Sequence, residues 1–438
     1  MSYPTTRALL LAAAAALVTV GSLLYPMLAA LGWLAVLVVL AVLAIDLRAS
    51  VQLTVPLLTR SLPARARLHE PCRIRYALSN PGAAPLDCRL LLDELPHELG
   101  GDVRLGPLRV PPGATETFER AVAPALRGQR ALGPSFVYAC SPLGLFVRRH
   151  AFEHGQTLGV YPANSFPEHR GLSSRSLLQE LGLRPRRPRG MGSEFESLRE
   201  YTPDDEPRRI DWRASARSQR PVVRDFHTER NHTIVVAVDC GRLMAAQSAG
   251  ASKLDHALGA AVSLVRACAQ GGDRIGFVAF DEALRAWVPP QRPARALAPI
   301  LEATLALAPR ACEPSYRTLA NVLQERQKKR ALIVLLTDFV EGASTPGLEA
   351  YLALLARRHC VLLVGIRDRL LREVEAAAPD VAGLDVYRRL VLQDLDVARQ
   401  AAVARIARTG VQTLDLDATQ ITAPLLDRYL RIREAGLM

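Results

Sequence analysis

The sequence predicts an α/β doubly wound domain in the C-terminal half of the chain, preceded by a transmembrane helical hairpin and a β-sandwich domain. From Thr233 onwards, apolar runs of strand length alternate with helical patterns, which is typical of a mostly parallel sheet covered by helices. Residues 48–163 show short runs of alternating polarity between Pro and Gly turns, the pattern of a β-sandwich. The stretch from Ala8 to Ile45 holds no charged residue, which favours membrane insertion.

The charge-free stretch is interrupted near its middle by Tyr25-Pro26, which leaves two apolar segments long enough to span a bilayer. We therefore expect two transmembrane helices in residues 1–47; a cleaved signal peptide followed by one span is the alternative. Both arrangements place the bulk of the chain on the side of the N-terminus. By the positive-inside rule, the arginines that follow predict a multi-pass protein of the inner (plasma) membrane with its soluble domains in the cytoplasm. These arginines are Arg48, Arg60, Arg65 and Arg67.

Length and composition narrow the possible partners. A chain of 438 residues is too long for one ordinary domain. The net charge is +12, but arginines are spread along the whole sequence and aromatic residues make up only 5% of it. We therefore expect no nucleic-acid partner. The seven cysteines include no C-x-x-C pair, which favours reduced thiols in the cytoplasm.

The region between the membrane segment and the C-terminal domain divides into two parts. Residues 48–163 form the predicted β-sandwich, which we interpret as a spacer. Residues 164–191 are an Arg- and Pro-rich connector with an extended, polyproline-like run. The strands expected in the sandwich are Val51 to Val55, Cys72 to Leu78, Arg89 to Leu92, Glu116 to Ala121 and Ser135 to Ala139.

The α/β domain is assigned to residues 233–438. Ligands of such sheets collect at the carboxyl ends of the strands, where Asp239 and Asp338 fall. The predicted strands are Thr233 to Val238, Arg274 to Phe280, Leu284 to Val288 as an edge, Ala331 to Leu336, Cys360 to Ile366 and Val411 to Leu416. The predicted helices are Lys253 to Gln270, Pro293 to Leu307, Thr318 to Lys328, Gly347 to Arg357, one within Val391 to Arg408, and one that closes at about Arg433.

Residues 192–232, called the signature segment below, carry the densest run of charges, with alternating signs among large apolar residues. A solvated surface segment with paired charges is one interpretation. Because Trp212 and Ile210 need a place to bury their side chains, we expect instead that the segment packs on the α/β domain, with Asp211 paired to an arginine.

The order of residue types in this segment resembles the bacterial family catalogued as domain of unknown function 58. The matching positions are Glu194, Phe195, Leu198, Arg199, Tyr201, Pro203, Asp205, Arg208, Ile210, Asp211, Trp212, Ala216 and Arg217. One departure is Asp204, where the family usually has Gly. The family is similar to those found with MoxR-type AAA+ ATPases, so the resemblance implies such an ATPase and other proteins as partners.

The C-terminal pattern resembles a von Willebrand factor type A domain, whose metal-ion-dependent adhesion site uses Asp-x-Ser-x-Ser, a Thr and a second Asp. The resemblance implies that Asp239, Thr318 and Asp338 are the matching ligands. The two serine positions hold Gly241 and Leu243, so a site for Mg²⁺ would lack two hydroxyl ligands. We therefore expect a degenerate site and no cofactor, with the aspartates capping helices or accepting from loop N–H groups. Weak Mg²⁺ binding is the alternative.

The sequence predicts no enzyme. It contains no G-x-x-x-x-G-K-[ST], H-E-x-x-H or G-x-S-x-G motif. Our interpretation is a membrane-anchored, cytoplasm-facing adaptor for protein binding that works with a MoxR-type ATPase. One alternative is a Mg²⁺-dependent ligand-binding module without an ATPase. Another is a phosphohydrolase, which would need a second carboxylate two residues after Asp239, where Gly241 stands.

Overall fold

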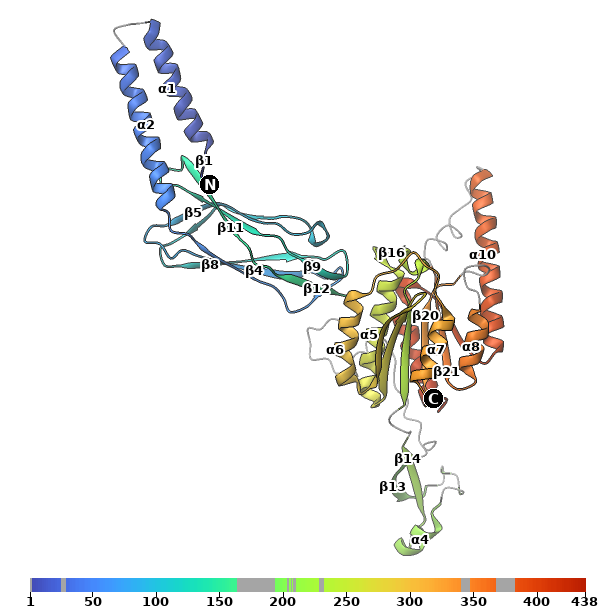
Figure 1. Ribbon diagram of the computed structural model, residues 1–438. Helices are drawn as coiled ribbons and strands as arrows, with labels where there is room; N and C mark the ends of the chain where they lie inside the picture. Colours follow the sequence, from blue (N-terminus) through green and yellow to red (C-terminus); the bar gives the residue numbers. More distant parts are fainter. Residues whose placement is uncertain are drawn as a thin grey trace. The chain divides into compact units, whose positions relative to one another are not determined.

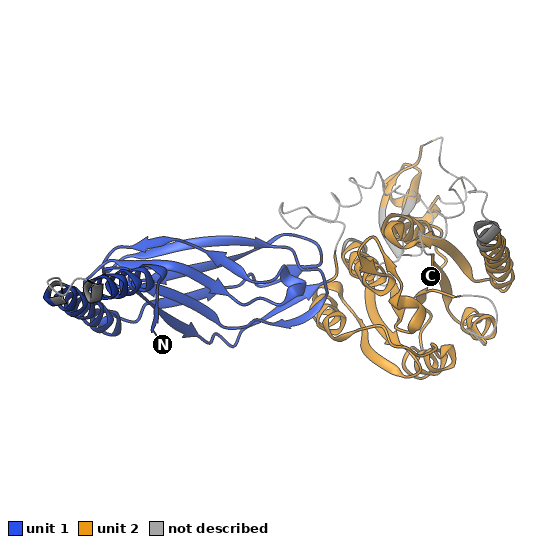
Figure 2. Ribbon diagram, turned by 90° about the horizontal axis from the view of Figure 1, so that it is seen from above, with its two compact units in different colours: residues 1–161 blue, residues 162–438 orange. Residues whose placement is uncertain are grey.

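The structure of the protein is a computed structural model, which describes residues 2–24, 29–163, 194–202, 205, 207, 210–227, 232–339, 347–367 and 383–438. The chain divides into two compact units, Met1–Tyr161 and Pro162–Met438 (Figure 1 and Figure 2). The predicted connector, residues 164–191, lies outside the described residues. Each unit is therefore considered by itself.

The first unit begins with two long apolar helices that lie side by side, α1 (Thr6–Leu24) and α2 (Ala29–Gln52) (Figure 1). Large apolar side chains such as Leu10 and Leu37 are exposed. Among the described residues, Gly32–Gln52 is long and apolar enough to cross a membrane, and Thr6–Gly21 is a shorter apolar helix. The first unit therefore carries a helix suited to membrane association.

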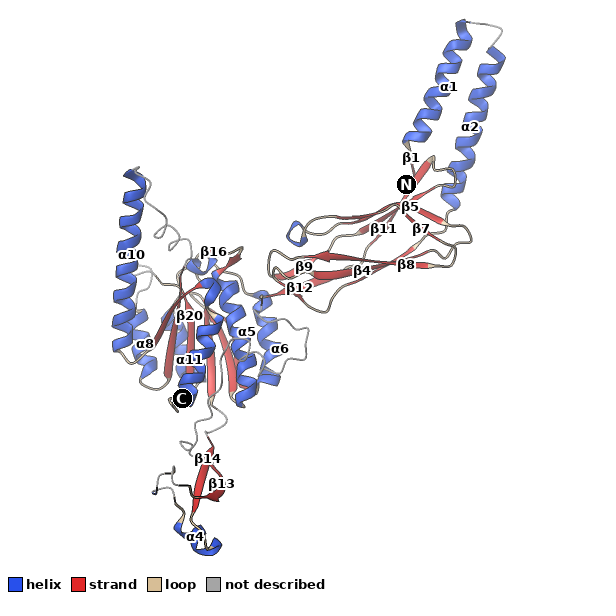
Figure 3. Ribbon diagram, turned by 180° about the vertical axis from the view of Figure 1, so that it is seen from behind, coloured by secondary structure: helices blue, strands red, loops and turns tan. Residues whose placement is uncertain are grey.

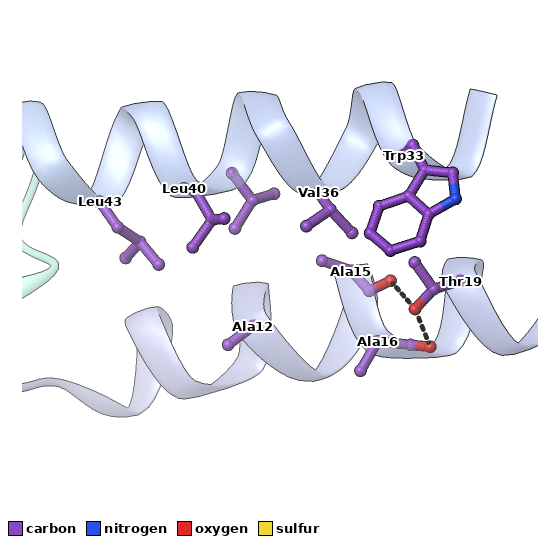
Figure 4. Close-up of a pocket in the computed structure, with 9 residues that line it drawn as sticks. Ala12, Ala15, Ala16, Thr19, Trp33, Val36, Leu40 and Leu43 are labelled. Atoms are coloured by element: carbon purple, nitrogen blue, oxygen red, sulfur yellow. Dashed lines mark hydrogen bonds between the residues drawn. The ribbon is translucent and has the colours of Figure 1, made fainter. Parts of the chain in front are cut away.

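The two helices are separated along part of their length by an apolar cavity of about 460 Å³. Small side chains of α1, including Ala12 and Ala15, line the cavity together with Trp33 and Leu40 of α2 (Figure 4). Thr19 also lines the cavity, and its hydroxyl donates to the backbone oxygens of Ala15 and Ala16 at 3.1 and 2.7 Å. The hydroxyl is thus satisfied within its own helix, which keeps the lining apolar.

The remainder of the first unit is built from β-sheets. The order of the largest sheet is β1-β11-β10-β5-β6, with β7 also paired to β5; two smaller sheets have the orders β2-β4-β8 and β3-β12-β9. The strands are β1 (Ser2–Pro4), β2 (Leu57–Ser61), β3 (Ala66–Arg67), β4 (Cys72–Ser79), β5 (Leu86–Asp93), β6 (Val103–Leu105), β7 (Leu108–Val110), β8 (Thr115–Val122), β9 (Gly128–Ala131), β10 (Ser135–Cys140), β11 (Phe146–Phe152) and β12 (Thr157–Tyr161).

Four of the predicted strands in this region are confirmed as β4, β5, β8 and β10, whereas the strand predicted over Val51 to Val55 is wrong. Helix α2 continues to Gln52, beyond the predicted boundary at residue 47. Arg48 and Ala49 are good helix formers, so the helical pattern extends past the apolar stretch. The first strand of this region, β2, begins at Leu57, directly after Pro56.

A buried ion pair connects two of the sheets. Arg60 of β2 donates from Nη1 to Oδ1 of Asp93 in β5 at 2.7 Å, and both side chains are fully buried. The hydroxyl groups of Tyr76 and Ser135 also donate to Asp93, both at 2.6 Å. Because an unpaired buried carboxylate is costly, these donors tie the two sheets together at one point.

A second carboxylate fixes the end of α2 to the β-domain. Asp46 is buried and accepts from the hydroxyl of Ser141 at 2.5 Å and from the backbone N–H groups of Leu143 and Leu145 at 3.0 and 3.1 Å. These donors lie in the turn between β10 and β11. At the other helix, β1 pairs with β11 directly before α1 begins. Both helices are therefore attached to the same sheet.

The second unit contains a six-stranded sheet with the order β19-β18-β15-β20-β21-β22, in which only the edge strand β19 is antiparallel. The strands are β15 (Thr233–Asp239), β18 (Arg274–Phe280), β19 (Leu284–Gln291), β20 (Leu332–Thr337), β21 (Cys360–Arg367) and β22 (Gln412–Asp417). The described helices of this unit include α5 (Lys253–Gly271), α6 (Pro293–Ala306), α7 (Tyr316–Arg326), α8 (Leu348–Ala356), α10 (Gly383–Arg408) and α11 (Thr422–Glu434).

Helices flank the sheet (Figure 3), and the sheet separates two apolar cores. Side chains of α5, α6 and α11 pack on one face with Ile234 and Val236, whereas α7, α8 and α10 pack on the other face with Val235 and Ala237. Alternate residues of one strand thus serve opposite cores, which explains why its sequence is a continuous apolar run. The predicted α/β alternation is confirmed.

The signature segment forms an antiparallel pair of strands, β13 (Glu194–Glu200) and β14 (Val222–His227), with a short helix, α4 (Trp212–Ser218), in the connection (Figure 1). Ile210 makes an isolated bridge to Val223 of β14. These residues are called the signature hairpin below.

Replacing Asp46 with Ala tests the attachment of α2. The N–H groups of Leu143 and Leu145 would lose their buried acceptor, at a cost of about 1–3 kcal/mol each. We expect the turn peptide to exchange its amide hydrogens roughly ten- to a hundredfold faster, as measured by hydrogen exchange and mass spectrometry in detergent micelles. Asp87→Ala, at a solvent-exposed carboxylate, is the control. Unchanged exchange at the turn in Asp46→Ala would contradict the attachment.

Candidate functional site

Asp239 and Asp338 lie at the carboxyl edge of the sheet on neighbouring strands. Asp239 ends β15, Asp338 directly follows β20, and these two strands pair in parallel. Both side chains are buried. The sequence expectation that the two aspartates share one edge of the sheet is confirmed.

Asp239 is held by two neutral donors. The hydroxyl of Thr337 donates to Oδ2 at 2.6 Å, and the backbone N–H of Gly241 donates to Oδ1 at 2.7 Å. Burial raises the pKa of Asp239 to about 7, and the nearby charges of Asp338 and Asp281 add to the increase, although the two hydrogen bonds oppose it. Asp239 therefore changes its protonation state near neutral pH.

Asp338 is held by two cationic side chains. Nζ of Lys253 lies 2.7 Å from Oδ2, and Nη1 of Arg399 lies 2.8 Å from Oδ1. The side chains of Lys253 and Asp338 are only 5% and 6% exposed. Lys253 is the first residue of α5, where a capping box between Ser252 and Asp255 fixes the start of the helix.

Arg399 extends the ion pairs across the edge. Its Nη2 lies 2.9 Å from Asp415 in β22, and Arg367 at the end of β21 lies 2.5 Å from the same carboxylate. Arg399 also stacks on the ring of Phe339, with 4.6 Å between its Cζ and the ring centroid. Burial alone would lower the pKa of Arg399, but hydrogen bonds to Asp415 and the charge of Asp338 raise it. Helix α10 is thereby attached to β22 and to the end of β20.

Gly365 leaves the space in which Asp415 and Arg399 come close to each other. A Cβ atom at Gly365 would lie 2.8 Å from Oδ1 of Asp415 and 3.0 Å from Nη2 of Arg399. A side chain at this position would therefore push the carboxylate and the guanidinium apart.

The structure places Thr318, the third expected member of the site, on α7. Its hydroxyl contacts Oγ of Ser315 at 2.9 Å and the backbone oxygen of Glu282 at 3.2 Å. The hydroxyl bonded to Asp239 comes from Thr337 instead. Sequence reasoning missed Thr337, Lys253 and Arg399; the position of Thr337 directly before Asp338 was the one available signal.

The donor set does not fit a divalent cation. Among the described residues, no group of three or more His, Cys, Asp and Glu side chains is placed to hold a metal ion. Both oxygens of Asp338 already accept from cationic side chains. A Mg²⁺ ion needs nearly octahedral oxygen ligation, whereas Oδ2 of Asp338 faces the ammonium of Lys253 at 2.7 Å.

The signature hairpin contains a second set of paired charges. Arg199 binds Asp205 with two parallel contacts, Nη1 to Oδ2 at 2.7 Å and Nη2 to Oδ1 at 2.5 Å. Thr202 donates to the same carboxylate from its backbone N–H and its hydroxyl. The hydrogen bonds from Arg199 and Thr202 lower the pKa of Asp205. These contacts therefore stabilise the start of the connection between β13 and β14.

Asp211 is the N-cap of α4 and accepts from the backbone N–H groups of Arg213 and Ala214 at 3.0 and 3.1 Å. Trp212, the first residue of the helix, is 70% exposed, so the prediction that it is buried is wrong. The helix instead contacts β14 through Ser215, whose hydroxyl accepts from the N–H of Val222 at 2.9 Å. The ring of Trp212 is not needed for that contact.

The other signature residues take different positions. Leu198, Ala216 and Arg217 are exposed, and Tyr201 and Ile210 are half-buried. Glu194 and Phe195 belong to β13, but their side chains lie outside the described residues, as does the whole of Arg208.

Comparison with known proteins agrees with the resemblance noted in the sequence. Residues 197–409 match the family described as protein of unknown function DUF58. The DUF58 match includes most of the signature segment together with Asp239, Lys253, Asp338 and Arg399. Uncharacterized proteins of Mycobacterium bovis and Mycobacterium tuberculosis are homologous: each is 29% identical over 277 residues, which cover 59% of this chain and 84% of theirs.

Two solved structures show weaker similarity. The conserved hypothetical protein BatB of Bacteroides thetaiotaomicron is 16% identical with a TM-score of 0.33, over 47% of this chain and 100% of that one. An aerotolerance-related membrane protein of Bacteroides fragilis is 16% identical with a TM-score of 0.30, over 46% and 99%. Both TM-scores are below the level from which a shared fold is inferred.

The raised pKa of Asp239 predicts a pH dependence. The folded protein keeps this proton up to about pH 7, whereas an unfolded chain releases it near the ordinary value of 3.8. The unfolded state thus binds fewer protons between these values, so the free energy of unfolding should fall with rising pH, by up to about 1.4 kcal/mol per pH unit. Asp239→Asn should remove this contribution, as measured by hydrogen exchange of β15 at graded urea concentrations.

The matched control is Asp427→Asn, at a partly exposed carboxylate on α11 that pairs with Arg431. It should keep the pH dependence of the wild-type protein. If the free energy of unfolding depends on pH in the same way for the wild type and Asp239→Asn, the pKa of Asp239 is not raised in the folded protein.

Proposed function

We propose that this protein is a membrane-anchored adaptor that faces the cytoplasm and binds partner proteins through its signature hairpin. The observation that carries the proposal is the exposure of Trp212, at 70%, beside the exposed arginines Arg213 and Arg217. Trp and Arg are enriched among residues that dominate binding energy in protein interfaces. A large exposed ring without a structural role in its own helix fits a contact surface.

The charge of this surface indicates the chemistry of the partner. Arg213 and Arg217 are exposed on α4, whereas Asp211 and Asp205 are engaged in hydrogen bonds within the hairpin. The surface therefore suits an acidic partner with an apolar pocket for the indole ring. A MoxR-type AAA+ ATPase is the partner proposed from the family resemblance.

We also propose that α1 and α2 form a transmembrane hairpin. Strand β1, directly before α1, pairs with β11, and Asp46 near the end of α2 binds the turn between β10 and β11. The start of α1 and the end of α2 thus meet one domain, so two helices in the bilayer would cross it twice. Arg48 after the second span favours the cytoplasm for that domain.

The α/β unit is proposed to be von Willebrand factor A-like. The support is its mostly parallel sheet with one antiparallel edge, placed between two layers of helices, with aspartates at the carboxyl edge. In this proposal the domain is a rigid support for binding and carries no reaction. Its aspartates are engaged by side chains of the same chain.

Truncation of Trp212 tests the contact surface. Because the ring is exposed, Trp212→Ala should change the free energy of unfolding by less than about 0.5 kcal/mol. If the ring is an interface anchor, the same variant should lose at least about 2 kcal/mol of binding, roughly thirtyfold in Kd. Capture of a purified MoxR-type ATPase from the same organism, with the full-length protein in detergent, measures the loss.

Tyr387→Ala is the matched control, since Tyr387 is 69% exposed and lies on α10. It should bind like the wild type, and Trp212→Phe should retain part of the affinity. If Trp212→Ala binds normally, the signature hairpin is not the contact surface. If it is strongly destabilised, the ring has a structural role.

Reporter fusions test the orientation. Alkaline phosphatase fused after Leu24 should be active, because the chain would then end on the periplasmic side, whereas a fusion after Met438 should be inactive. A fluorescent protein fused after Met438 should fold and fluoresce in the cytoplasm. An active phosphatase at Met438 would rule out the two-crossing, cytoplasm-facing arrangement.

A further inference from the structure

Three buried carboxylates lie at the carboxyl edge of the sheet. Asp239, Asp281 and Asp338 are all buried there, and the charges of Asp281 and Asp338 both contribute to the raised pKa of Asp239. Asp281 accepts from the N–H of Ala283 and lies 3.5 Å from Nε of Arg285. Clustered buried carboxylates need cationic partners. Where clustered carboxylates bind a metal ion, the ion supplies the positive charge that compensates them.

Lys253 supplies a positive charge at an unusual place. A buried lysine is rare unless it is paired, and the first turn of a helix disfavours a cation because the helix dipole is positive there. Lys253 is nevertheless buried at the first position of α5, with its Nζ 2.7 Å from Oδ2 of Asp338. The attraction of the carboxylates at this edge accounts for its position.

The loop after β15 leaves little room for a side chain at position 241. A Cβ atom at Gly241 would lie 3.0 Å from each of three atoms: Oδ1 of Asp239, the backbone oxygen of Cys312 and Cδ of Pro314. The loop thus folds closely over Asp239, and its backbone N–H at Gly241 donates to the carboxylate. A serine at position 241 would require the neighbouring atoms to shift by a few tenths of an ångström.

We infer that the ammonium group of Lys253 takes the place of a divalent cation at the carboxyl edge of the sheet. The lysine is a tethered counter-ion for Asp338, and Arg399 is the second. The edge is therefore built to work without a metal. The inference goes beyond the adaptor proposal and does not depend on it, because the signature hairpin contributes none of these residues.

Removal of the ammonium group of Lys253 should make the stability of the protein depend on a metal ion. In Lys253→Met, which keeps the length and apolar stem of the side chain, Asp338 loses one counter-ion while the carboxylates stay together. We expect this variant of the full-length protein to melt at a lower temperature than the wild type and to regain several degrees in millimolar Mg²⁺. The wild type should melt at the same temperature in Mg²⁺ and in EDTA.

Direct binding of Mn²⁺, followed by the electron paramagnetic resonance of the free ion, gives a second readout. The wild type and Lys253→Arg should bind no Mn²⁺ at this edge, Lys253→Met should bind one ion per chain, and Lys253→Met/Asp338→Asn should bind none. Binding of Mn²⁺ by the wild type that Asp338→Asn abolishes would overturn the inference, and so would a folded Lys253→Met that gains no ion. If Lys253→Met folds only when Mg²⁺ is present, the inference is supported; if it fails to fold in either condition, the counter-ion cannot be exchanged for a metal and the inference falls.

Discussion

The buried ion pairs of Asp338 are the interaction on which the second unit depends most. Lys253 begins α5, which packs in one core of the sheet, and Arg399 belongs to α10, which packs in the other. One carboxylate at the end of β20 is therefore bonded to helices on both faces. Because the ammonium of Lys253 and the guanidinium of Arg399 both bind this buried carboxylate, the cluster positions two helices at once. Asp415 continues the cluster to the neighbouring strands.

Much of the fold follows from local sequence patterns. The continuous apolar runs that become β15 and β20 indicate strands buried on both faces, and a polar residue after each run places the two aspartates at one edge. The partners of these aspartates could not be predicted in the same way. Lys253 and Arg399 lie 85 and 61 positions from Asp338, and their sequence contexts are an ordinary helix start and a helix interior.

At Trp212 the sequence led to a wrong prediction, because a general rule about burial does not hold in this short helix. Large rings are usually buried, but α4 is short and already contacts β14 through Ser215 and the backbone of Val222. The helix start is satisfied by the cap at Asp211, so nothing in the hairpin requires the ring. The same residues that stabilise the hairpin leave an aromatic and several arginines exposed, and this links its local structure to the adaptor function proposed above.

Crystals of the protein soaked in Mn²⁺ and measured at a wavelength where manganese scatters anomalously would test the tethered cation most directly. We expect continuous electron density for the side chain of Lys253 up to its contact with Asp338, and no anomalous peak within coordination distance of Asp239 or Asp338. An anomalous peak bound by these two carboxylates, with Lys253 turned away from them, would contradict it.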